Sequence, residues 1–172
     1  MQAKSQKSED RVVEHVDRER ITDFIYLESR LLDQRHFEDW LALYDEDGSY
    51  WVPSQVDQKS PLDDVSIFYD DKELMRTRVA RLNHPRIHID DPQTRSVRML
   101  NNIEIERAEP GDDYELRVRA VLCAVIYFQR QQYVYGGRCE YQLRDRDKLS
   151  ILSKRVDLIN CDGLLPPLVV PF

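Results

Sequence analysis

Four long strand patterns in the second half of the sequence constrain the fold more than any other feature. Each run is rich in β-branched and aromatic residues, and turn signals such as EPGDD and RDRD separate one run from another. The runs predict strands at residues 96–107, 114–129, 132–143 and 149–160. Because consecutive strands joined by short turns pair antiparallel, we expect one long, mostly antiparallel sheet.

The first half of the sequence carries helical rather than strand periodicity. Apolar residues recur with helical spacing through 20–34, and shorter helical patterns follow at 36–44 and 71–82. Between them, DEDG at 45–48 predicts a turn, and SYWVP at 49–53 predicts a short edge strand. Helices followed by consecutive strands are typical of the α+β class. We therefore expect N-terminal helices packed on a long, curved, mostly antiparallel mixed sheet, which together form a cone.

Three of the strands carry details that the fold must accommodate. In the first strand, the alternation predicts that four apolar residues share one face: Val97, Met99, Ile103 and Ile105. Gly136 and Gly137 lie inside the third strand, where they predict a bulge or a sharp bend. In the second strand, residues 121–128 are apolar on both faces. That segment needs cover from the helices on one side and from something else on the other.

The segment GLLPPLVVPF, residues 163–172, has no charged residue and contains three prolines. The prolines exclude a regular helix or a central strand, and so many apolar side chains left in water would favour aggregation. We therefore expect this segment to dock, either on the core of its own chain or on another subunit. The apolar second face of residues 121–128 favours another subunit.

The length of 172 residues fits one domain. We expect residues 1–10 to form a disordered N-terminal tail and residues 11–172 to form a single domain with an apolar C-terminal arm at 163–172. The net charge of −7 argues against a nucleic-acid partner. No apolar run approaches the ~20 residues of a membrane span, and the polar first residues contain no secretory signal. We therefore expect a cytoplasmic protein without a membrane partner.

The stretch RLNHPRIHIDDPQTR contains the residue types of an iron-binding site: His84, His88, Asp90 and Asp91. Two histidines four residues apart share a metal ion on a helix, but Pro85 pushes His84 into an extended conformation. In an extended chain, such positions lie ~13 Å apart, which is too far for ligands bound at ~2.1 Å. We therefore expect no metal site here, and surface or contact roles for these side chains.

Other reactive residue types form no known motif either. Cys123, Cys139 and Cys161 are widely spaced, so they indicate three reduced thiols and neither a zinc nor an iron–sulfur site. Glu28 lies on the apolar stripe of the first helix, where a carboxylate needs a partner. We expect Glu28 to be an ion-paired structural group and not an acid catalyst.

A cone-shaped α+β fold can also hold a His/Asp or Tyr/Asp acid–base pocket. Five residues could supply one if burial tunes their pKa values: Tyr44, Asp47, His84, His88 and Asp90. A stand-alone dehydratase or isomerase is therefore one alternative function. A non-catalytic small-molecule binding domain is another.

Four stretches resemble the β (small) subunit of bacterial aromatic-ring-hydroxylating dioxygenases, the Rieske non-haem iron oxygenases. They are LLDQRHFEDWLALYDEDGSYWVP at 31–53, DPQTRSVRMLNNIEI at 91–105, GRCEYQLR at 137–144 and LSKRVDLINCD at 152–162. The resemblance extends over nearly the whole chain. In one departure, family members often carry a histidine in the 94–103 strand, where this chain has Arg98 and Met99.

The resemblance implies a nuclear-transport-factor-2-like (NTF2-like), or cystatin-like, cone and a cytoplasmic α3β3 hexamer. In such complexes the α subunit carries the Rieske [2Fe-2S] cluster and the mononuclear Fe(II), binds the aromatic substrate and forms a cis-dihydrodiol with O2. Electrons come from NAD(P)H through a reductase, often with a ferredoxin. The β subunit is mainly structural, so the resemblance assigns this chain no catalytic, cofactor-binding or metal residue. Its expected partners are the α subunit and other copies of itself in a β trimer.

Overall fold

The computed structural model describes residues 15–84, 93–166, 168 and 170–172, so the predicted tail at 1–10 lies outside the described residues. Its elements follow one another as α2 (His15–Asp33), α3 (Phe37–Leu41), β1 (Tyr44–Pro53), β2 (Ser66–Asp71), α4 (Lys72–Leu82), β3 (Arg95–Arg107), β4 (Leu116–Phe128), β5 (Gln131–Asp145) and β6 (Leu149–Leu158). No described helix is long and apolar enough to cross a membrane.

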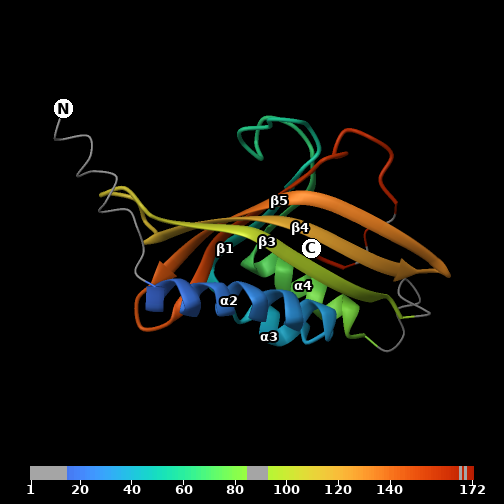
Figure 1. The fold of residues 1–172 in the computed structure, drawn as a ribbon. Helices are drawn as coiled ribbons and strands as arrows, with labels where there is room; N and C mark the ends of the chain where they lie inside the picture. The colour runs from blue at the N-terminus through green and yellow to red at the C-terminus, as the bar shows by residue number, and fades with distance from the viewer. Residues whose placement is uncertain (1–14, 85–92, 167, 169) are drawn as a thin grey trace.

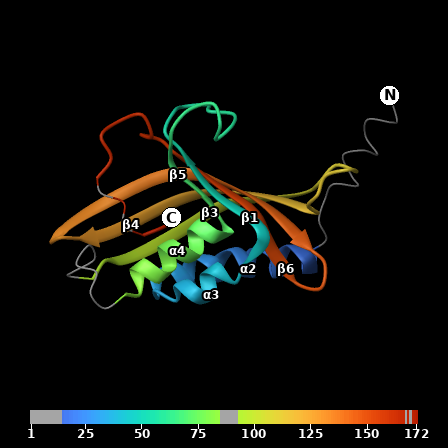
Figure 2. The same ribbon diagram turned by 180° about the vertical axis from the view of Figure 1, so that it is seen from behind.

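The described strands form one sheet in the order β2-β1-β6-β5-β4-β3. Neighbouring strands pair antiparallel except β1 and β6, which pair parallel, so the sheet is mixed. The sheet curves over α2, α3 and α4, and the chain ends between the sheet and the helices (Figures 1 and 2). This architecture confirms the predicted α+β cone, and all four strands predicted in the second half are present.

Helix α2 packs its apolar stripe against the sheet. Ile21 and Ile25 are fully buried, and burial of each such side chain stabilises the fold by roughly 1.5–3 kcal/mol. The helix ends in a Schellman motif, in which Arg35 has a positive φ of 61° and the His36 N–H donates to the Leu31 carbonyl oxygen at 2.8 Å. The chain turns sharply at this point and enters α3.

The predicted turn at 45–48 is wrong, because these residues belong to β1, which starts at Tyr44. The register with β6 slips between Tyr44 and Ser49, so the acidic segment bulges from the strand without ending it. The Arg144 guanidinium holds the bulge by donating to the Asp47 carboxylate at 2.6 and 2.9 Å. Pairing with the neighbouring strand therefore overrides the local turn preference of DEDG.

A bulge near Asn102 divides β3 into two halves. The register with β4 slips at this point, and Asn102 has a positive φ of 51°. Because side chains alternate between the two faces of a strand, an extra residue reverses the face of every residue after it. The predicted single apolar face is therefore wrong. It divides into two exposed residues before the bulge and two inward residues after it: Val97 and Met99, then Ile103 and Ile105.

Gly136 and Gly137 do not form the predicted bulge. The register of β5 with β4 runs unbroken through both glycines, where Gly137 pairs with Leu122. The glycines instead permit close packing beside β6, since a Cβ atom on Gly137 would lie 2.6 Å from the main-chain oxygen of Asp157. A Cβ atom on Gly136 would meet the end of the flexible Ile159 side chain at 3.4 Å.

These distances predict different outcomes for two adjacent substitutions. Gly137→Ala forces the β5 and β6 backbones apart, so we expect the free energy of unfolding to fall by about 1–3 kcal/mol. Gly136→Ala is the matched control, because the side chain that it meets can move, and we expect a change within about 0.5 kcal/mol. Urea denaturation measures both variants, and equal stabilities would contradict the close approach at Gly137.

Candidate functional site

The interior of the cone holds a buried ion pair between helix and sheet. The Lys154 ammonium on β6 lies 2.6 Å from the Glu28 carboxylate on α2, and the two side chains are 2% and 0% exposed. Burying two charges costs free energy, and such a pair is tolerated when each charge is matched and hydrogen-bonded. The predicted ion pairing of Glu28 is confirmed.

Aromatic side chains complete the shell around this pair. The Trp40 indole N–H donates to the Glu28 carboxylate at 2.8 Å, and the Tyr141 hydroxyl donates to the same carboxylate at 3.4 Å. The Lys154 ammonium lies 5.2 Å from the centre of the Tyr141 ring, a cation–π distance. Burial, helped by the Glu28 charge, raises the pKa of the Tyr141 hydroxyl well above its usual value, so the hydroxyl stays protonated.

The last residues of the chain fill the space next to the ion pair. Val170 and Phe172 are buried, and the ring centres of Phe172 and Tyr135 lie 5.1 Å apart in an edge-to-face contact. The main-chain oxygen of Phe172 accepts a hydrogen bond from the Lys154 ammonium, and the Phe172 N–H donates to the Tyr50 hydroxyl at 3.0 Å. The end of the C-terminal arm therefore docks on its own core, and the preference for another subunit is wrong for these residues.

Arg98 connects this terminal segment to helix α2. Its guanidinium donates to the Pro171 carbonyl oxygen and forms an ion pair with Asp33. The Asp33 carboxylate also accepts hydrogen bonds from the Arg98 main-chain N–H at 2.8 Å and from the Ser96 hydroxyl at 2.9 Å. Arg98 is buried, so these charge-assisted hydrogen bonds form away from water, where they are stronger.

The residues proposed for an acid–base pocket do not come together. Tyr44 is buried in the core, and its hydroxyl has no hydrogen-bond partner among the described residues. Asp47 lies on the outside, where its hydrogen bonds with Arg144 lower the pKa of its carboxyl. His84 is exposed just after α4. These three residues therefore do not form the His/Asp or Tyr/Asp pocket.

The remaining residues of the apparent iron site, His88, Asp90 and Asp91, lie outside the described residues. Within the described ranges, no three His, Cys, Asp or Glu side chains gather in a way that could hold a metal ion. Cys139 is buried, and burial raises the pKa of its thiol to about 11. A thiol with so high a pKa is a poor nucleophile near neutral pH.

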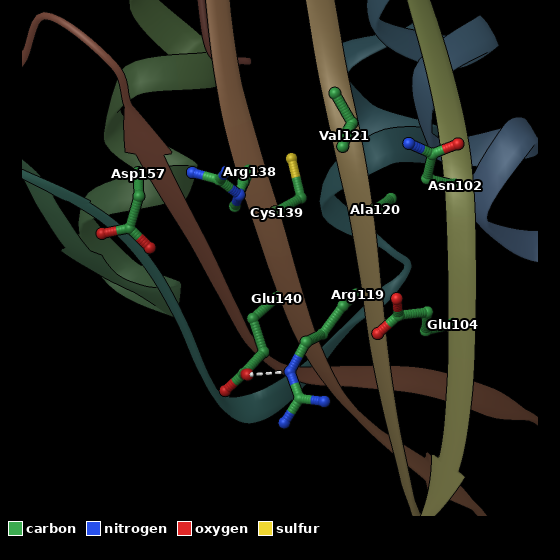
Figure 3. Close-up of a pocket in the computed structure, with 9 residues that line it drawn as sticks. All are labelled: Asn102, Glu104, Arg119, Ala120, Val121, Arg138, Cys139, Glu140 and Asp157. Atoms are coloured by element: carbon green, nitrogen blue, oxygen red, sulfur yellow. Dashed lines mark hydrogen bonds and ion pairs between the residues drawn. The ribbon is translucent and has the colours of Figure 1, made fainter.

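The outer face of the sheet carries an open groove of about 440 Å³ that crosses β3, β4, β5 and β6. Figure 3 shows the side chains that line it. The Arg119 guanidinium donates to the Glu140 carboxylate at 3.0 Å and pairs with Glu106 at 3.3 Å. Arg138 and Asp157 lie at the other end of the groove. The groove is therefore lined by charges of both signs, and Arg119 and Glu140 neutralise one another within it.

An exposed apolar surface adjoins the groove. Four side chains on this face are 40–64% exposed, and we call them the outer-face patch: Val97, Met99, Val121 and Val134. Strand pairing places Val97 opposite Val125 and Val125 opposite Val134, so apolar side chains run across three strands. A contiguous apolar surface of this kind is typical of a protein–protein contact.

Sequence reasoning missed Lys154 as the partner of Glu28. The signal is present, because Lys154 alternates with Val156 and Leu158 on the buried face of the last strand. A lysine on a buried face needs a buried carboxylate, and the helical stripe offers Glu28. Arg98 carries no comparable signal, because it lies between Val97 and Met99 and therefore on the face opposite to the predicted apolar face of this strand.

Comparison with known proteins identifies the family. The family model described as ring hydroxylating beta subunit matches residues 27–162. The small oxygenase component of the p-cumate 2,3-dioxygenase system of Pseudomonas putida is 36% identical over 154 residues, which cover 88% of this chain and 83% of that protein. The chain belongs to the ring-hydroxylating β-subunit family. The resemblance seen in the four sequence stretches is confirmed.

Solved structures agree with membership of the ring-hydroxylating β-subunit family. The β subunit of the benzoate 1,2-dioxygenase of Burkholderia mallei is 30% identical, with a TM-score of 0.68 over 87% of this chain and 93% of that one. A scytalone-dehydratase-like protein of Novosphingobium aromaticivorans, at 18% identity, shares the fold with a TM-score of 0.60 over 83% of this chain and 84% of that one. The predicted NTF2-like cone is confirmed, and the stand-alone dehydratase alternative is not favoured.

The buried ion pair predicts an asymmetry between single and double substitutions. Lys154→Met leaves the Glu28 carboxylate buried without its cation, so we expect the free energy of unfolding to fall by about 3–5 kcal/mol. The double variant Glu28→Gln with Lys154→Met buries no charge, and we expect it to regain much of that loss. Urea denaturation measures the free energy of unfolding of the wild type and of both variants. Equal losses in the single and double variants would argue against an ion pair shielded from water.

Proposed function

We propose that this chain is the non-catalytic, structural β subunit of the terminal oxygenase component of a bacterial aromatic-ring-hydroxylating dioxygenase. The observation that carries the proposal is the family match, together with 36% identity to a dioxygenase small oxygenase component. In this proposal the whole complex is a cytoplasmic oxidoreductase of aromatic degradation. It performs the NAD(P)H-dependent cis-dihydroxylation of an aromatic compound.

The filled interior of the cone supports a structural role. An acid–base enzyme needs a pocket in which a titratable group faces the substrate. Here the Glu28 carboxylate is paired with Lys154, and Phe172 occupies the space beside them. We therefore assign no catalytic, cofactor-binding or metal residue to this chain.

The proposed partner is an α subunit that carries the Rieske [2Fe-2S] cluster and the mononuclear Fe(II). Three copies of each chain form α3β3, and the β trimer holds the α subunits at a fixed spacing, so that the cluster of one reaches the iron of its neighbour. The reductase and ferredoxin meet this chain only through the complex. The names of the relatives, which are small or β subunits of oxygenases, support a partner subunit of this kind.

The outer-face patch supports self-association of the chain. Inner residues of segment 121–128, such as Leu122 and Ile126, are buried beneath the sheet, whereas Val121 on the outer face remains 40% exposed. We propose that a second copy of the chain covers this face in the β trimer. The exposed Leu164 and segment 36–53 are further elements that we expect to contact other subunits.

The proposal predicts that the isolated chain forms a trimer, which light scattering after size-exclusion chromatography measures directly. Met99→Lys places a charge in the outer-face patch, so we expect it to shift the trimer toward the monomer. Leu74→Lys on α4 is the matched control, because Leu74 and Met99 are 51% and 52% exposed, and we expect the trimer to survive it. A monomeric wild-type chain would rule out the proposed self-association.

Co-expression with an α subunit tests the larger assembly. We expect the purified complex to contain iron and to convert an arene to a cis-dihydrodiol, because the cluster and the iron belong to the α subunit. The isolated chain serves as the control, and we expect metal analysis to find no stoichiometric iron in it. Turnover of an aromatic compound by the isolated chain would contradict a non-catalytic subunit.

A further inference from the structure

The last residues, Pro171 and Phe172, make contacts inside the cone that resemble those of a bound ligand. The Phe172 ring is fully buried and contacts the Tyr135 ring edge-on. The polar main-chain atoms beside the ring also have partners: the Phe172 N–H donates to Tyr50, and the Phe172 oxygen accepts from Lys154. The Pro171 carbonyl oxygen accepts from the Arg98 guanidinium. One aromatic ring, one N–H and two oxygens are thus recognised together.

The groups that recognise this segment are held in place by other parts of the fold. Lys154 on β6 is fixed by its ion pair with Glu28, and Arg98 on β3 is fixed by its ion pair with Asp33. Tyr50 on β1 packs edge-on against Trp40 at 6.2 Å between ring centres. Since these contacts do not involve the terminal segment, the partners are pre-organised, which reduces the entropy lost when a ligand binds.

The terminal segment also leaves polar groups unused. The Arg98 Nε and the Tyr135 hydroxyl are buried, and neither has a hydrogen-bond partner among the described residues. Buried polar groups in folded proteins are usually hydrogen-bonded. The site that surrounds Phe172 therefore contains more hydrogen-bonding groups than Val170–Phe172 uses.

We propose that the cone interior is a binding site for an N-acylated aromatic amino acid, and that the chain's own Phe172 occupies it. The acyl carbonyl of such a ligand takes the place of the Pro171 carbonyl beside Arg98, and its N–H faces Tyr50. A carboxylate oxygen takes the place of the Phe172 oxygen beside Lys154. This inference goes beyond the proposed structural function and does not depend on it.

The test removes the internal occupant and supplies the ligand from solution. The variant lacks Val170–Phe172. The probe is N-acetyl-L-phenylalanine, which carries the aromatic ring, the N–H and the two oxygens that the site around Phe172 binds. Isothermal titration calorimetry and the melting temperature measure binding. We expect saturable binding to the truncated chain and a melting temperature that rises with probe concentration, because the probe binds the folded state. We expect neither effect with the full chain, whose tethered Phe172 competes at a high effective concentration.

Matched controls distinguish specific binding of the probe from non-specific binding. Leu164→Ala alters a fully exposed residue of the same arm and keeps Phe172, so we expect it to behave like the full chain. N-acetylphenethylamine lacks the carboxylate that would meet Lys154, and we expect it to bind the truncated chain roughly tenfold more weakly or worse. We expect a similar loss for the D-enantiomer of the probe, which cannot place ring, N–H and oxygen together.

A second variant keeps the test decisive if the truncated chain does not fold alone. Phe172→Ala retains the main-chain contacts and removes the ring, so we expect it to bind toluene, as apolar cavities in proteins do. Refolding the truncated chain with the probe, but not with N-acetylphenethylamine, should recover soluble protein. A folded truncated chain that binds no probe, or a full chain that binds it equally well, overturns the proposal. Failure of both refolding and toluene binding overturns it as well.

Discussion

The ion pair of Glu28 and Lys154 joins the first described helix to the last strand in the interior of the cone. An ammonium ion buried away from water must be paired and hydrogen-bonded. The elements that supply its partners must therefore lie next to one another. Trp40 and Tyr141 bring α3 and β5 to the same carboxylate. The same ammonium also holds the main-chain oxygen of Phe172. The helices, the sheet and the C-terminal residues therefore all contact the same buried ion pair.

The interior of this cone is filled by its own side chains, which leaves the outer face of the sheet exposed to other subunits. An acid–base enzyme needs an open pocket beside a titratable group, whereas here Val170 and Phe172 occupy the space between helices and sheet. Arg98 connects this terminal segment to α2. Close packing makes such an interior stiff, which fits the structural role that we propose. The outer-face patch and the charged groove beside it are exposed surfaces that partners could cover.

The sequence predicts the parts of this structure that burial alone decides. Alternating apolar residues place the four long strands, and the helical stripe places Glu28 in the core, because both patterns follow from the geometry of one element. The turn predicted at 45–48 and the single face predicted for β3 are wrong, because strand pairing and the bulge at Asn102 involve residues distant in sequence. The sequence does not predict the site around Phe172 for the same reason, because the contacting residues of Phe172 come from three separate strands.

The most direct measurement of the central claim is hydrogen exchange at the Phe172 amide, followed by NMR in the full chain. If the ion pair and the chain end share one buried core, this amide opens only with the core, and it exchanges as slowly as the amides of β6. The exposed Leu164 in the same arm provides the fast reference. Exchange at Phe172 as fast as at Leu164 would show that the chain end is not part of the core.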